Sequence, residues 1–172
     1  YNRKWIKKKT QKNKVDLKKL KKIKIEDALV KILSSPNHSN KSWVTNQFDQ
    51  TVMCDTVQKS GSDAAIIRIH SKDKAIAVSV DSSANYCKAY PLVGGKQIVC
   101  ENWRNLIAVG AKPLAITNCL NFGNPENEEI MGEFAECLEG IREACEFLNY
   151  PVVSGNVSFY NGTNKKNINP TP

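Results

Sequence analysis

The chain has 172 residues, of which 41% are hydrophobic, so one ordinary domain with an appendage is expected. Its formal charge of +8 is uneven: residues 1–24 hold twelve Lys or Arg against one acid, which leaves a net −3 on the rest. No stretch reaches the length of a membrane span, and the N-terminus lacks the apolar core of a signal peptide. These features argue against membrane and secreted proteins and predict a cytoplasmic location.

Residues 1–22 are polar, rich in lysine and without apolar periodicity, which predicts a linker. A lysine-rich segment can bind phosphate backbones, but Tyr1 and Trp5 are its only aromatic residues. Because no stacking platform is present, nucleic-acid binding is not expected.

Residues 23–60 begin with a predicted helix and continue as a polar connection. Ile25, Leu29 and Ile32 recur at helical spacing, and the run Ser34–Ser35–Pro36–Asn37 ends the pattern. This part is expected to connect the linker to the domain that follows.

Residues 61–172 carry the alternating pattern of an α/β domain. The order predicted is strand, strand, helix, strand, helix, strand, over residues 64–70, 75–80, 94–109, 113–120, 126–148 and 150–154. This order favours an α/β or α+β fold, a mixed sheet covered by helices. The six cysteines show neither C-x-x-C pairs nor zinc spacing, which predicts reduced, mostly buried thiols.

The last predicted strand leads into a polar turn that contains Gly155, Asn156 and Ser158. A glycine allows close backbone approach, and the neighbouring oxygens suit phosphate or a metal-bound nucleotide. The alternative is an ordinary exit from a strand into a loop.

Two further polar residues follow or end predicted strands. Asp81 comes directly after a strand and is a hard oxygen ligand suited to magnesium, whereas Asn118 lies near the end of the next strand. Ligands of open α/β sheets gather beyond the carboxyl ends of strands. The alternatives are a turn role for Asp81 and pairing of Asn118 with nearby backbone.

The run Gly94–Gly95–Lys96 is predicted to open a helix, where free backbone N–H groups favour an anion. The spacing of a Walker A loop is absent, so this run is a weaker candidate for phosphate binding.

An ordered series of motifs resembles the phosphoribosylformylglycinamidine synthase family, within the aminoimidazole ribonucleotide synthetase-like superfamily. The resemblance covers about residues 20–172 and implies the linker and N-terminal α/β domain of the second of two related units. The motifs are Gly94–Gly95–Lys96–Gln97, Trp103–Arg104–Asn105–Leu106, Ala108–Val109–Gly110–Ala111, Leu120–Asn121–Phe122–Gly123–Asn124–Pro125, Gly140–Ile141 and Pro151–Val152–Val153–Ser154–Gly155–Asn156–Val157–Ser158.

The resemblance implies ATP-dependent conversion of formylglycinamide ribonucleotide to the amidine, in purine biosynthesis, with ammonia from a glutaminase. It places Asn118 and Gly155 at ATP, Asn156 at Mg²⁺ and Ser158 at the ribonucleotide. It places no catalytic residue here, because the family's catalytic histidine belongs to the first unit. The expected partners are the missing portions of the synthase, a glutaminase subunit and a second copy paired through the sheet into a barrel.

The chain departs from the family at several polar positions. Asn118 replaces a usual aspartate, Gly61–Ser62–Asp63–Ala64 replaces Gly-Gly-Asp-Ala, and acids are missing from Tyr90–Pro91–Leu92–Val93. With an apparent truncation after Pro172, these changes predict a split product or a decaying fragment that is inactive alone. The alternatives are a non-catalytic ATP and magnesium binding module and a structural remnant without ligand.

Overall fold

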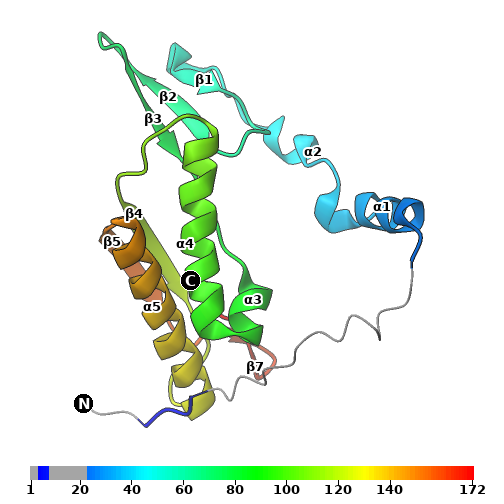
Figure 1. Cartoon of the computed structure of the whole chain (residues 1–172), viewed down its shortest axis with the longest axis vertical. Helices are drawn as coiled ribbons and strands as arrows, with labels where there is room; N and C mark the ends of the chain where they lie inside the picture. Colours follow the sequence, from blue (N-terminus) through cyan, green and yellow to red (C-terminus); the bar gives the residue numbers. More distant parts are fainter. Residues whose placement is uncertain (1–3, 8–22) are drawn as a thin grey trace. The chain divides into compact units, whose positions relative to one another are not determined.

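The structure, a computed structural model, describes residues 4–7 and 23–172 (Figure 1). The predicted linker of residues 1–22 therefore lies largely outside the described residues. The described chain divides into two compact units, residues 23–54 and residues 4–7 with 55–172. The domain boundaries expected after residues 22 and 60 stay a prediction. In the structure, the continuous part of the larger unit begins at Asp55.

The smaller unit contains only short helices. Helix α1 (Ile25–Leu33) confirms the helix predicted here, and its residues are exposed or half-buried, with Ile25 82% exposed. The 3₁₀ helix η2 (Pro36–His38), helix α2 (Ser42–Thr45) and the 3₁₀ helix η3 (Val52–Cys54) follow. None of these four helices buries a residue, so the unit has no core of its own in this part of the chain.

The larger unit begins with an antiparallel sheet in the order β1-β2-β3. Strands β2 (Ala65–Ile69) and β3 (Lys74–Val78) form the predicted hairpin, with Ile67 opposite Ile76. Strand β1 (Thr56–Gln58) was not predicted, because its three residues are too short a run for a periodic pattern.

Two long helices form the centre of the larger unit. Helix α4 (Pro91–Ala108) follows the short helix α3 (Ala84–Ala89) and lies alongside α5 (Glu128–Leu148) in Figure 1. Strand β4 (Ile116–Asn121) pairs in parallel with β5 (Val152–Ser158), and α5 is the crossover between them. A small hairpin, β6 (Gly162–Thr163) and β7 (Lys166–Asn167), follows β5, and Thr171 beyond it pairs with Asn121 at the end of β4.

The ends of α5 are set by local sequence. The side chain of Asn127 accepts hydrogen bonds from the backbone N–H of Glu129 (2.8 Å) and Ile130 (3.3 Å), which caps the N-terminus. Asn149 ends the helix in the left-handed region at φ 50°. The long predicted helix is thereby confirmed, with a start at Glu128.

The core lies between α4, α5 and β4. Burial of these apolar side chains is the main force that holds the layers together. The buried residues from these elements include Ile98, Val99, Leu106, Leu120, Cys137, Ile141 and Ala144.

Glycines let the backbones of α4 and α5 approach closely. A Cβ on Gly95 would overlap the carbonyl oxygen of Cys137, and a Cβ on Gly140 would overlap the carbonyl oxygen of Leu92. The two glycines therefore set the spacing of the helix pair.

All six cysteines are free thiols. Cys87, Cys137 and Cys145 are buried, whereas Cys54 and Cys119 are exposed, so the prediction of buried thiols holds for only part of the set. Over the residues that the structure describes, no helix has the length and apolar character needed to cross a bilayer.

Candidate functional site

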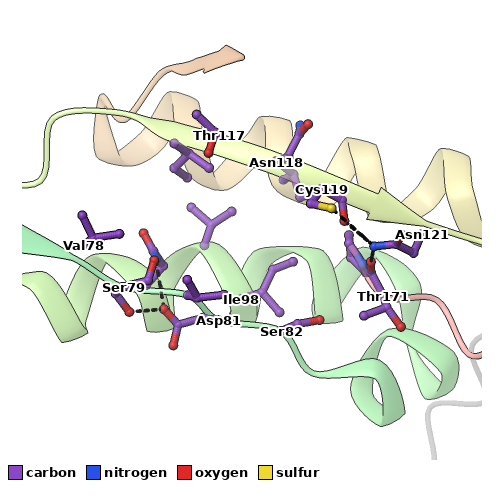
Figure 2. Close-up of a pocket in the computed structure, with 16 residues that line it drawn as sticks. Val78, Ser79, Asp81, Ser82, Ile98, Thr117, Asn118, Cys119, Asn121 and Thr171 are labelled. Atoms are coloured by element: carbon purple, nitrogen blue, oxygen red, sulfur yellow. Dashed lines mark hydrogen bonds between the residues drawn. The ribbon is translucent and has the colours of Figure 1, made fainter. Parts of the chain in front are cut away.

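A cavity of about 430 Å³ lies where the end of β3, the middle of α4 and strand β4 meet (Figure 2). Val78, Ile98 and Ile116 supply apolar walls, and Asp81 supplies a carboxylate. Asp81 is the one charged residue of the described lining, and Asn118 lines the same cavity, so apolar walls with a few polar groups give it the usual character of a small-molecule site.

The carboxylate of Asp81 is the centre of a hydrogen-bond network. Asn105 Nδ2 donates to its Oδ1 (2.6 Å), and Asn102 Nδ2 donates to its Oδ2 (2.9 Å). The hydroxyl of Ser79 also donates to Oδ2. Because three donors already use the two oxygens, Asp81 ties the end of β3 to α4 and has limited capacity to bind a metal.

Tyr150 extends this network into the core. Its side chain is buried, and its hydroxyl donates a hydrogen bond of 2.7 Å to Asn102 Oδ1. Burial raises the pKa of Tyr150 above its ordinary value of 10.0, and the charges of Cys145 and Asp81 act in the same direction. The neutral phenol is therefore the form that the fold favours.

A second hollow, of about 450 Å³, lies over the β4–β5 pair and is lined by Asn118, Gly155 and Asn156. Asn118 stands opposite Gly155 in the parallel register, and a Cβ on Gly155 would overlap the Asn118 side-chain oxygen. Among the described residues, neither Asn118 nor Asn156 forms a side-chain hydrogen bond that would occupy its amide. The hollow thus offers two available amides, and the Asn118 side chain occupies the space above Gly155.

The position of Gly155 corrects one prediction. The sequence predicted a buried strand that ends at Ser154, followed by a turn, but β5 continues through Ser158 and its residues are exposed up to Val157. Gly155 lies in the middle of the strand because its parallel partner β4 supplies hydrogen bonds along the whole segment. The glycine makes room for Asn118 and forms no turn.

Ser158 lies apart from the lining of this hollow. Its hydroxyl donates to Asn161 Oδ1 (3.2 Å), and Asn161 Nδ2 donates to the backbone oxygens of Ser158 and Phe122, both at 3.0 Å. These bonds fix the corner where β5 ends. The structure therefore brings together Asn118, Gly155 and Asn156, and places Ser158 at the end of β5. Asn118 also lines the cavity that contains Asp81.

The interpretation of Gly94–Gly95–Lys96 as the start of a helix is wrong. Helix α4 starts at Pro91, and the N–H of Gly94 already donates to the carbonyl of Tyr90 (2.7 Å). A Cβ on Gly94 would lie 2.6 Å from Cys87 Cα, and Lys96 forms an ion pair with Glu143 on α5. Packing between helices uses these residues, so they offer no free N–H groups to an anion.

Sequence reasoning missed the amide partners of Asp81. Asn105 lies in the motif Trp103–Arg104–Asn105–Leu106, but Asn102 and Tyr150 carried no signal of their own. The hydrogen-bonded pairs of this network that join different elements are separated by as few as 21 and as many as 48 positions in the sequence, and only folding brings them together. In the described ranges, 4–7 and 23–172, no group of three or more His, Cys, Asp or Glu side chains is arranged to hold a metal ion.

Comparison with known families agrees with this fold. The family model of the AIR synthase related protein, N-terminal domain, matches residues 61–172. The chain belongs to this family. The match begins just before β2 and includes both the Asp81 network and the β4–β5 hollow.

Individual relatives are more specific. The chain is 62% identical over 173 aligned positions to phosphoribosylformylglycinamidine synthase subunit PurL of Pelagibacter ubique, and the match covers all of this chain and 24% of that protein. Among solved structures, PurLQS from Thermotoga maritima matches with a TM-score of 0.72 and 37% identity, over 77% of this chain and 22% of that one.

Complexes of T. maritima PurL also match. The ATP complex has a TM-score of 0.67 and 38% identity, over 77% of this chain and 22% of that one. The FGAR complex has the same TM-score and coverage at 37% identity. This chain spans about a quarter of the length of the curated relative from P. ubique. The resemblance read from the motifs is confirmed.

Proposed function

We propose that this chain supplies an ATP-binding surface to a phosphoribosylformylglycinamidine synthase that converts formylglycinamide ribonucleotide to the amidine in purine biosynthesis. The observation that carries the proposal is the hollow over β4–β5, where Asn118 and Asn156 present available amides beside Gly155. The similarity to PurL structures that contain ATP and FGAR supports the same ligands. The proposed location is the cytoplasm.

Asn118 and Gly155 are proposed to contact ATP. Gly155 leaves room for the Asn118 side chain above the strand, and the Asn118 amide can donate to or accept from the ligand there. Ser158 is proposed to contact the ribonucleotide at the end of β5, where Asn161 holds its hydroxyl in place.

Magnesium fits these residues only in part. The exposed amide oxygen of Asn156 can occupy one coordination position, but Asp81 is already hydrogen-bonded by three donors. Mg²⁺ is usually held by one or two carboxylates together with phosphate oxygens and water. We therefore propose Asn156 as one neutral ligand, with the phosphates of ATP as the main ones; the ion would neutralise phosphate charge.

The chemistry of the reaction requires groups beyond this surface. The hollow is lined by two amides, the hydroxyl of Ser154, a glycine and apolar side chains, and its described lining holds no histidine, carboxylate or lysine that could act as an efficient general acid or base. We propose that the rest of the synthase supplies the catalytic groups and a glutaminase subunit supplies ammonia, and that the chain alone does not catalyse the reaction.

Calorimetric titration of the purified chain with ATP and Mg²⁺ tests the proposal. Saturable binding is expected, and Asn156→Ala and Asn118→Ala should each weaken it by about tenfold, since each removes a polar contact worth ~1–1.5 kcal/mol. Asn37→Ala, in an exposed 3₁₀ helix of the smaller unit, should bind as the parent does. The absence of heat from a folded sample would contradict the proposed site.

A non-catalytic ATP-binding module is the second candidate. The described lining of the β4–β5 hollow favours it, because amides that can hold a nucleotide are present there without a histidine or a carboxylate. The two candidates differ in one measurement: addition of a chain that carries the first unit, with a glutaminase, should produce amidine only if the synthase role is correct.

A further inference from the structure

A second polar pocket lies at the C-terminal hairpin, separate from the hollow over β4–β5. Its volume is about 420 Å³. It is lined by Asn124, Tyr160, Gly162, Lys165, Lys166 and Asn167. None of these residues lines the hollow proposed for ATP.

The hairpin that carries the pocket is anchored to the loop before α5. The N–H of Asn124 donates to Asn167 Oδ1 (2.8 Å), and the N–H of Tyr160 donates to the carbonyl of Gly123 (3.0 Å). A Cβ on Gly123 would lie 2.5 Å from Asn167 Cβ, so a glycine is needed for this contact. The pocket is therefore held by side-chain and backbone bonds on two of its sides.

The turn of the hairpin fixes the lysines. Asn164 and Lys165 have φ values of 51° and 62°, the pattern of a two-residue turn with both central residues in the left-handed region. Lys166 follows in β7, opposite Thr163. The turn therefore places two consecutive lysines at the edge of the same pocket.

The charge of the pocket is positive. Its lining contains two lysines and no carboxylate, and neither lysine pairs with an acid among the described residues. The side chain of Asn167 accepts from Asn124 through Oδ1, which leaves its Nδ2 as a donor. Outside the lining, Glu126 Oε1 accepts a long hydrogen bond of 3.4 Å from the hydroxyl of the lining residue Tyr160.

We propose that this pocket binds the phosphate group of a small phosphorylated ligand. The ammonium groups of Lys165 and Lys166 supply the charge, and Asn167 Nδ2 supplies an oriented donor. The proposal rests on these residues alone and does not depend on the proposed synthase activity.

The test is a titration of the ¹⁵N-labelled full chain with inorganic phosphate and with ribose 5-phosphate, followed by NMR at low salt. The amide signals of Gly162 and Asn167 should shift in a saturable way. The double variant Lys165→Ser/Lys166→Ser should weaken binding by about tenfold, because two charge-assisted contacts are lost. Equal affinity for both probes would identify free phosphate as sufficient, and tighter binding of ribose 5-phosphate would identify a phosphate ester.

The matched control is Lys72→Ser/Lys74→Ser on the β2–β3 hairpin, which removes the same charge from another turn. This variant should bind within about twofold of the parent, since loss of general charge has only a weak screened effect. Equal weakening in the two double variants would show non-specific attraction and overturn the proposal. An unchanged affinity after loss of Lys165 and Lys166 would overturn it as well.

Discussion

At the residue scale, the pairs that define the candidate site join distant positions of the chain. Gly155 is needed because Asn118, 37 positions earlier, leans over it from the neighbouring strand. Asp81 is satisfied by amides of Asn102 and Asn105, which approach from helix α4. A glycine that was predicted in a turn and an aspartate that was predicted as a magnesium ligand, with a turn role as the alternative, thus take part in contacts between elements.

The alkaline limit of stability should depend on Tyr150. Its raised pKa means that folding favours the neutral phenol. This contribution is fully present below pH 10 and is lost as the pH rises through the raised pKa. Tyr150→Phe should therefore reduce the decline of unfolding free energy above pH 10, measured by urea denaturation at several pH values.

The same variant loses the hydrogen bond to Asn102, so it should be less stable by about 1 kcal/mol at pH 7. Tyr86→Phe is the control, because Tyr86 is 59% exposed. A variant of Tyr150 with the full alkaline decline of the parent would contradict the role given to this residue.

At the element scale, the spacing of α4 and α5 depends on glycine. Gly140→Ala should destabilise the chain by about 1–3 kcal/mol, since the new methyl overlaps the Leu92 carbonyl in a packed interface. The clash should outweigh the ~1 kcal/mol of stabilisation that alanine gains over glycine through its higher helix propensity. Urea denaturation monitored by circular dichroism would measure the difference.

Gly132→Ala is a matched control on the same helix. Its Cβ would meet the carbonyl of Ile6, in the short described segment Lys4–Lys7, and not a helix of the core. Displacement of that segment loses one backbone bond, from Ile6 N–H to the Glu128 carbonyl (3.1 Å). Gly132→Ala should therefore be nearly neutral, and equal losses in both variants would refute the helix-spacing argument.

At the scale of the whole molecule, one face of the β2–β3 hairpin is apolar and exposed. Cross-strand pairing puts its branched side chains on a common face. They are Ile67, Ile69, Ile76 and Val78, with exposed fractions of 43%, 38%, 54% and 48%. Such a face favours pairing with another sheet, which agrees with the barrel expected from the family resemblance.

The purified chain should therefore self-associate, and analytical ultracentrifugation at several concentrations would measure it. Ile76→Lys should shift the chain towards monomer, because a charge in the paired face is costly to bury. Phe147→Lys changes a residue that is 89% exposed on α5 and should leave the association unchanged. A parent chain that stays monomeric at all concentrations would contradict the prediction.

The sequence alone determined the family, the β2–β3 hairpin and the long helix ending at Leu148, and through the family resemblance it proposed Asn118, Gly155 and Asn156 as site residues. These follow from local periodicity, capping residues and ordered motifs, all of which are written in neighbouring positions. The tertiary structure decided the length of β5 and the start of α4 at Pro91.

It also decided which side chains meet. The Asp81 network, the Asn118–Gly155 contact and the lysine pocket each join segments far apart in the chain. Hydrogen bonds between strands and close packing between helices depend on partners that no local pattern specifies. For this reason the candidate residues were visible in the sequence, whereas their partners were not.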